Sequence, residues 1–261
     1  APMLFLLLKN LISWRAGVIL VVLCGAASVL NLTRVTVPND KPAPGGKNRS
    51  GGFGFMRDPG FLVLAGMMLF YLCSEYAING WLVTYIQNKE SLLKSLAAGG
   101  QDVTAAVRTY SQTMATLLWV VMLLGRLFCA WLSGKVSQKK IMMVSSFGVA
   151  VFFTMMLLSG NMVTVSLSVA GLGFCMAGIC PMIYSDAAIF TNTYPMATGA
   201  LLAIGSAGAI AMPTIVGATA EKFGFTGGMS AILVTVCLLM VFSVLNVVVK
   251  TRKPQVNTEA A

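Results

Sequence analysis

The chain has 261 residues, of which 57% are hydrophobic and 10% are charged, and its mean hydropathy is +0.83. Soluble domains carry about 25% charged residues, so this composition excludes a water-soluble fold and predicts lipid as the main solvent of the chain. The formal net charge of +10 does not indicate nucleic-acid binding, because the basic residues lie mostly in short segments between long apolar runs.

The residue types also limit the chemistry. Histidine is absent, which excludes imidazole metal ligands and histidine-based acid–base catalysis. The six cysteines lie inside apolar runs without CxxC spacing, which is typical of small buried side chains and not of a zinc site or a disulfide framework. No paired carboxylates or nucleophile–base arrangement stands out. We therefore expect no metal, no cofactor and no enzymatic activity.

Long apolar runs predict membrane-spanning helices, each of which needs about 20 residues. The chain opens inside such a run, at 1–12, which we interpret as the tail of a helix that begins upstream. Turn residues at 159–161 and 191–195 divide the long stretch from Ile141 to Ala220, in which Asp186 is the only charged residue. The predicted full spans are 16–33, 61–86, 112–133, 141–159, 163–188, 196–219 and 226–249.

The segment 34–58 is rich in proline, glycine and charged residues, which is typical of a flexible linker. We therefore divide the chain into the end of a truncated N-terminal bundle (1–33), a cytoplasmic linker (34–58), a six-helix transmembrane bundle (59–250) and a cytoplasmic tail (251–261).

The basic residues of the loops predict the orientation of the chain. The loops on the side of 34–58 and the C-terminus hold eleven lysines and arginines, and the opposite loops hold six. Because cytoplasmic loops carry the excess of basic residues, we expect the linker and the C-terminus in the cytoplasm of a multi-pass cell-membrane protein.

A weak internal repeat accounts for the uneven division of one full span before the linker and six after it. Three pairs share one sequence offset and are followed by apolar runs: Pro2 with Pro213, Trp14 with Phe225, and Gly17 with Gly228. Chance similarity between apolar segments is the competing explanation. The repeat favours two related helical bundles, an architecture of secondary transporters.

The segment 125–139 carries a more specific pattern. Its glycine, arginine, leucine and two lysines at Gly125, Arg126, Leu132, Lys135 and Lys139 resemble the cytoplasmic signature between the eighth and ninth helices of the major facilitator superfamily. The sequence departs from that signature at Ala130, Gly134, Ser137 and Gln138, where glycine, aspartate, glycine and a basic residue are usual. The missing aspartate puts the charged gating latch of the family in doubt for this chain.

The resemblance implies an all-α membrane fold, with the C-terminal six-helix bundle of a twelve-helix transporter and the last one to two helices of its N-terminal bundle. The remainder of the N-terminal half would be the partner of this bundle. Residues 71–85, with Glu75 followed by Gly80-Trp81, resemble the first helix of the second half in fucose-permease-like sugar:proton symporters.

Glu75 is the main candidate for a proton carrier. A carboxylate at the centre of a spanning helix costs about 2.5–3.5 kcal/mol on insertion scales, so it should face the bundle interior or a wet cavity. A structural carboxyl that is hydrogen-bonded to a neighbouring helix is the alternative. Asn79, one turn later, shares its face, and Trp81 and Tyr85 form another stripe that suits sugar stacking or, equally, ordinary helix packing.

The 163–188 span is the other expected cavity wall, because the resemblance implies that the first and fourth helices of each half line the cavity. Pro181 and nearby glycines would allow this helix to bend next to Tyr184. Arg126 and Lys135 are candidates for a gating or structural role, as are Pro181 and Asp186. Asp186 is either a plain interfacial carboxylate or a partner of Arg126, and no sequence pattern chooses between the two.

We therefore expect a secondary active transporter that moves a small polar solute, such as a sugar or a related metabolite, by alternating access coupled to protons. Its partners would be the lipid bilayer, the solute, protons and the missing N-terminal half. An exporter of drugs or metabolites from the same superfamily is the first alternative, and a seven-helix receptor is a second. A seven-helix receptor would not explain the internal repeat or the basic residues of the segment 125–139.

Overall fold

Every regular element in the described residues is a helix. The computed structural model describes residues 14–34, 53–92, 103–191 and 194–249. The chain divides into two compact units, 1–49 and 50–261. The expected partial span at 1–12 and the tail at 251–261 lie outside the described residues, as does most of the expected linker.

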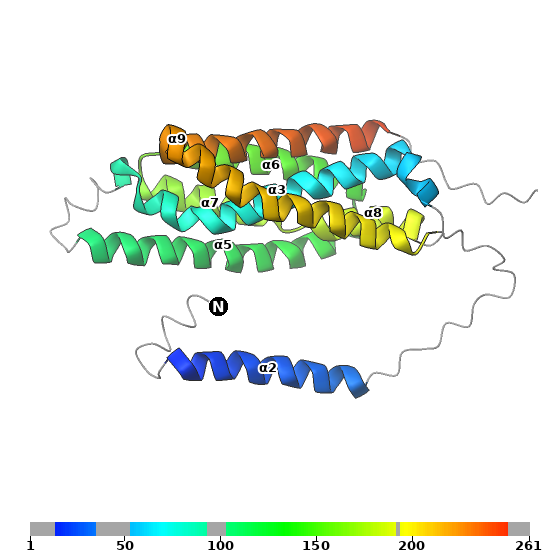
Figure 1. Cartoon of the computed structure of the whole chain (residues 1–261), viewed down its shortest axis with the longest axis horizontal. Coiled ribbons are helices and arrows are strands. Elements are labelled where there is room, and N and C mark those ends of the chain that lie inside the picture. The colour runs from blue at the N-terminus through cyan, green and yellow to red at the C-terminus, as the bar shows by residue number, and fades with distance from the viewer. Residues whose placement is uncertain (1–13, 35–52, 93–102, 192–193, 250–261) are drawn as a thin grey trace, which may run out of the picture. The chain divides into compact units, whose positions relative to one another are not determined.

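The first unit contains α2 (Trp14–Arg34), which covers the predicted 16–33 span. Its strongly apolar part, Val22–Asn31, is shorter than a full membrane span. The second unit contains the remaining helices: η1 (Phe53–Arg57), α3 (Pro59–Gln87), α5 (Val103–Ser133), α6 (Gln138–Leu158), α7 (Met162–Met176), α8 (Ile179–Thr191) and α9 (Met196–Val248) (Figure 1).

Five helical segments are long and apolar enough to cross a bilayer: α3, α5, α6, the α7–α8 pair and α9. The predicted all-α class is therefore confirmed for the described residues, and the chain is a multi-pass membrane protein. The helix α5 begins nine residues before the predicted 112–133 span. Its first turns carry Arg108 and several polar side chains, which a search for apolar runs excludes although they continue the helix.

Two of these helices begin at residues whose side chains cap the helix N-terminus. The Asp58 side chain accepts a hydrogen bond from the Gly60 amide at 2.7 Å, and Pro59 occupies the first turn of α3, where a missing N–H costs nothing. The Asn161 side chain likewise accepts from the Val163 amide at 3.0 Å and begins α7. These caps satisfy backbone donors that a helix leaves unpaired at its N-terminus.

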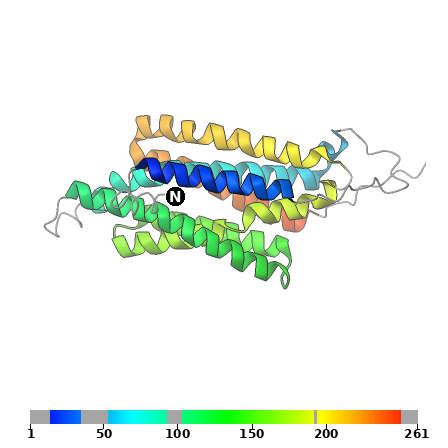
Figure 2. The ribbon, with the colours of Figure 1, turned by 90° about the horizontal axis from the view of Figure 1, so that it is seen from below.

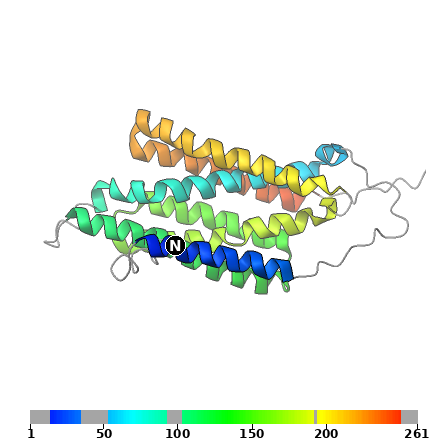
Figure 3. The ribbon, with the colours of Figure 1, turned by 60° about the horizontal axis from the view of Figure 1, so that its bottom comes forward.

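The helix α9 contains 53 residues, enough for about 80 Å if it were straight, whereas the hydrocarbon core of a bilayer is about 30 Å thick. The chain instead turns back on itself (Figures 1 and 3). Gly224 provides the turn, with φ 74° and ψ 175°, inside an otherwise helical segment. The two arms, 196–223 and 225–248, correspond to the two spans predicted at 196–219 and 226–249.

The helix α3 is the most deeply buried span. Within the membrane-length windows, 72% of α3 is buried, compared with 22% of α5. It packs mainly against α9 and also contacts α5 and α8, whereas α5 and α6 both pack on α7 (Figure 2). Most positions on α3 therefore face protein, whereas most positions on α5 do not.

Glycine allows α5 and α7 to approach each other closely. A Cβ on Gly173 would lie 2.6 Å from the Leu118 carbonyl oxygen, and one on Gly125 would lie 2.8 Å from the Phe174 carbonyl oxygen. Both positions oppose backbone atoms, which cannot rotate away as a flexible side chain can. Packing thus requires glycine at Gly125, the first residue of the predicted signature.

Replacing Gly224 by alanine should destabilise the protein by about 1–3 kcal/mol, because this backbone conformation is nearly restricted to glycine. No heavy atom lies within 4 Å of a Cβ built there, so the cost comes from the backbone alone. Gly199→Ala is the matched control in the same helix, because its added Cβ is also free of contacts. Thermal unfolding of the purified variants in one detergent should show a loss for Gly224→Ala only; equal behaviour of the two variants would contradict the assignment of the turn.

Candidate functional site

The predicted 163–188 span is interrupted in the structure. The helix α7 ends at Met176 and α8 begins at Ile179. The helical hydrogen-bond pattern is thus interrupted at Ala177 and Gly178, although Ala177 keeps helical torsion angles of φ −55° and ψ −42°. We call this interruption the break. Pro181 has no backbone N–H and cannot donate to the carbonyl four residues before it, which belongs to Ala177. The helical pattern resumes with the bond from the Met182 amide to the Gly178 carbonyl at 3.2 Å.

A side chain from α3 compensates for this break. The Tyr71 hydroxyl, which is fully buried, donates to the carbonyl of Met176 at 3.2 Å. The last carbonyls of a helix lack intrahelical donors, and in lipid no water replaces them. Tyr71 therefore fastens the end of α7 to the central helix of the bundle.

Glu75 lies one turn after Tyr71 on α3 and is 9% exposed. Its carboxyl group lies near the Tyr71 hydroxyl and within electrostatic reach of the Arg126 guanidinium of α5. Cys180, just after the break, lies near both groups. We call these four residues, Tyr71, Glu75, Arg126 and Cys180, the Glu75 cluster; it joins α3, α5 and the beginning of α8.

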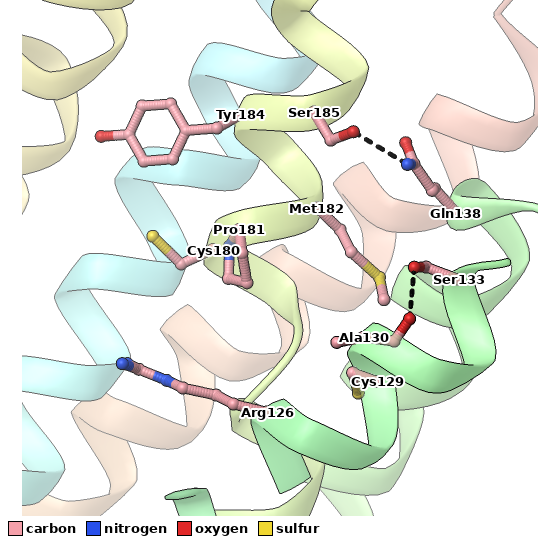
Figure 4. A pocket seen from close by; sticks show the side chains of 10 residues that line it. All are labelled: Arg126, Cys129, Ala130, Ser133, Gln138, Cys180, Pro181, Met182, Tyr184 and Ser185. Carbon is pink, nitrogen blue, oxygen red and sulfur yellow. Dashed lines mark hydrogen bonds between the residues drawn. The ribbon is translucent and has the colours of Figure 1, made fainter. Parts of the chain in front are cut away.

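A cavity of about 510 Å³ adjoins the Glu75 cluster between α5, α6 and α8. Its lining residues are Arg126, Cys129, Ala130, Ser133, Gln138, Cys180, Pro181, Met182, Tyr184 and Ser185. Figure 4 shows Arg126, Cys180 and Tyr184 extending toward α3, so that two members of the cluster are also part of the cavity wall. The bond from the Gln138 amide to the Ser185 hydroxyl, at 2.8 Å, lies in the same wall and connects α6 with α8.

The cavity wall combines two kinds of chemistry. Arg126, Gln138, Tyr184 and Ser185 provide donors and acceptors for a polar ligand. Its other side chains are small or apolar. Arg126 is exposed on the surface of this unit although it lies within a spanning helix, and a guanidinium in that position requires a water-filled cavity or a polar partner.

Asn79, Trp81 and Tyr85 are not among the residues that line this cavity. The Asn79 amide donates to the Glu75 backbone carbonyl at 2.9 Å, and the Trp81 indole donates to the Pro213 carbonyl at 3.3 Å. The Tyr85 hydroxyl lies 3.4 Å from the Leu157 carbonyl. The structure thus places Asn79 on its own helix and uses the two aromatic residues to join α3 to α9 and α6.

Tyr184, Pro181 and Arg126 do line the cavity, but Arg126 and Asp186 form no ion pair. The expected pairing gives way because Arg126 lies within electrostatic reach of Glu75, whereas the Asp186 carboxylate accepts from the Asn246 amide of α9 at 3.1 Å. Lys135 has its ammonium group 3.8 Å from the centre of the Trp131 ring, away from the cavity lining.

Two lysines bind the C-terminal ends of neighbouring helices. Lys139 donates to the carbonyls of Asn246 and Val249 at the end of α9, at 3.0 and 3.4 Å. At the opposite end of the bundle, Lys89 donates to the carbonyls of Met156 and Leu157 in the last turn of α6, at 2.8 and 3.0 Å. A cation at this end of a helix is favoured by the helix dipole. Partial burial nevertheless lowers the pKa of Lys89 below its usual range.

Sequence reasoning missed Tyr71, Cys180, Gln138 and Ser185. The sequence could have indicated Tyr71 as a neighbour of Glu75, because it precedes Glu75 by four residues and so shares its helical face. No sequence pattern indicates that Gln138 and Ser185 are neighbours, because their contact joins segments that are 47 residues apart in the chain.

Comparison with known proteins assigns the chain to no family. No protein-family profile matches the sequence, and a search of curated proteins finds no match. A functional assignment therefore depends on the residues of the site and on their geometry.

Tyr71→Phe should destabilise the bundle by about 1 kcal/mol, because it leaves the Met176 carbonyl without its donor while preserving the aromatic ring. Hydrogen exchange should also increase at the amides just after the break, in 178–182. The matched control is Tyr76→Phe on the same helix, whose ring is 54% exposed. Thermal unfolding and exchange mass spectrometry measure both effects, and unchanged protection of 178–182 in Tyr71→Phe would contradict the fastening role of Tyr71.

Proposed function

We propose that the chain is part of a secondary active transporter, which moves a small polar solute across the cell membrane by alternating access coupled to protons. In this proposal, residues 59–250 are the C-terminal six-helix bundle of a major facilitator transporter, and 1–33 belong to its N-terminal bundle. The linker and C-terminus lie in the cytoplasm. The observation that carries the proposal is the buried Glu75 carboxyl at a broken helix, beside a partly polar cavity.

The Glu75 cluster supports proton coupling. A carboxyl inside a membrane is costly when ionised, and a neighbouring cation reduces that cost. When Glu75 is ionised, Arg126 can compensate its charge; when Glu75 takes up a proton, the guanidinium is released for another partner. Proton binding at Glu75 thereby changes how far the positive charge of Arg126 is compensated at the cavity, because Arg126 lies near Glu75 and also lines the cavity.

The break at Ala177 and Gly178 supports alternating access. Broken helices at the membrane midplane are typical of transporter binding sites, where freed backbone groups line a cavity. Here α8 carries Pro181 and Tyr184 in the cavity wall, and the helical pattern between α7 and α8 is interrupted at Ala177 and Gly178. A tilt of α8 at the break would move the cavity wall without unfolding α7.

The cavity wall supports a polar solute. Guanidinium, amide, phenol and hydroxyl groups suit the hydroxyl groups of a sugar or a related metabolite. The stacking role expected for Trp81 and Tyr85 is not part of this proposal, because both residues serve helix packing. Arg126 is exposed on this bundle, which favours a second bundle that closes the cavity from the other side.

Glu75→Gln in the intact transporter should abolish uptake that is driven by a pH gradient, because the amide cannot bind or release the proton. Solute exchange without a gradient should continue, because the amide keeps the size of the side chain. The measurement is uptake of labelled sugars and related metabolites into proteoliposomes, with and without the gradient, in both membrane orientations. Active transport only outward would favour the exporter.

The matched control is Glu221→Gln, which removes an exposed carboxylate near the turn of α9. Its pH-driven uptake should equal that of the unchanged protein. Full pH-driven uptake by Glu75→Gln would reject Glu75 as the proton carrier, and no transport of any solute in the panel by the unchanged protein would reject the transport proposal.

A further inference from the structure

A second cavity lies on the other side of α5 and has no part in the proposed transport. It has a volume of about 370 Å³, within the range of small-ligand sites. Its lining residues are Phe128, Cys129, Leu132, Val136, Lys140, Ile141, Val144, Ser145, Phe174 and Cys175. We call this cavity the α5–α6 groove. It exists because α5 and α6 both pack on α7 and hardly touch each other.

The walls of the groove suit a hydrocarbon chain. Phe128 and Phe174 contact each other with ring centroids 5.3 Å apart, and Phe128 contacts Trp131 at 5.8 Å. Val144 on the facing helix is 67% exposed. Because these side chains belong to membrane-spanning helices and face outward, lipid tails are the apolar material that they meet.

One end of the groove is positively charged. Lys140 lines it, and Lys135 stands at the end of the aromatic row, with its ammonium 3.8 Å from the centre of the Trp131 ring. The helix α6 begins between these lysines, and its cap residue Ser137 makes no side-chain capping bond. The first amides of α6 therefore add a partial positive charge to the same place.

No carboxylate from this part of the chain neutralises these charges. The sequence has no aspartate or glutamate from Val103 to Ser185, which includes all of α5, α6 and α7. Asp186, the next acidic residue, accepts a hydrogen bond from Asn246. Lysine and aromatic residues at the end of membrane helices also mark the level of the lipid head groups.

We propose that the α5–α6 groove binds one phospholipid with a negatively charged head group. One acyl chain lies along Phe128, Phe174 and Val144, and the phosphate lies between Lys140, Lys135 and the N-terminus of α6. An apolar groove alone would accept any lipid. The cations at its end make the site selective for an anionic one, since each lysine near a membrane surface attracts anionic lipid by an amount that corresponds to about a fivefold change in affinity.

The test is native mass spectrometry of the purified full chain, mixed with phosphatidylglycerol and phosphatidylcholine that carry the same acyl chains. The unchanged protein should retain one phosphatidylglycerol in preference to phosphatidylcholine. Lys140→Gln should weaken phosphatidylglycerol retention about fivefold and leave phosphatidylcholine unaffected, whereas Lys140→Arg should preserve the preference. Lys222→Gln, which removes an exposed lysine from α9, is the charge control and should not change the retention of either lipid.

A second pair of variants tests the acyl-chain part of the site. Val144→Trp fills the groove and should reduce phosphatidylglycerol retention, whereas Val151→Trp, two turns further on α6 and outside the groove, should not. Soluble glycerol phosphate should fail to displace the bound lipid. Three results would each overturn the proposal: equal retention of the two lipids by the unchanged protein, a loss of phosphatidylglycerol retention in Lys222→Gln as large as in Lys140→Gln, or displacement of the bound lipid by glycerol phosphate.

Discussion

The α3 helix stabilises the break between α7 and α8 by donating a hydrogen bond to a backbone carbonyl at the end of α7. In a bilayer, an unpaired carbonyl has no water to bind, so a non-helical segment requires a partner from the protein. Tyr71 provides that partner at Met176 from the most deeply buried helix of the bundle. The position of α8, and with it the wall of the larger cavity, depends on this contact and on the close packing of α5 against α7.

The few charged groups within the spans occupy different environments for the same electrostatic reason. Glu75 is buried on the central helix within electrostatic reach of Arg126, whereas Arg126 itself is exposed on the surface of this unit. Asp186 is satisfied by an amide of α9. Ions in a low-dielectric environment are tolerated when they are paired or hydrogen-bonded, and a change in one partner then affects the other. That coupling is the physical basis of the proposed proton dependence.

The basic turn after α5 uses its lysines in two ways. Lys139 binds the carboxyl end of α9, where the partial negative charge of the helix favours a cation. Lys135 and Lys140 remain at the surface, next to an aromatic and aliphatic groove. One short turn thereby joins two helices of the bundle and forms the positive end of the proposed lipid site.

The sequence by itself determined the all-α membrane class and the approximate positions of the spans, because the length and hydropathy of an apolar run are properties of the chain alone. It also indicated Glu75 and Arg126 as candidate functional residues, because charged residues inside apolar runs are conspicuous. The interruption at Ala177 and Gly178 was anticipated only as a bend at Pro181. Only the tertiary structure decided that Glu75 lies within electrostatic reach of Arg126 while Asp186 accepts a hydrogen bond from Asn246. It also decided that Trp81 and Tyr85 pack against backbone carbonyls. Such partners are decided by which helices become neighbours, and residues 50 or more positions apart leave no local pattern from which their contact could be read.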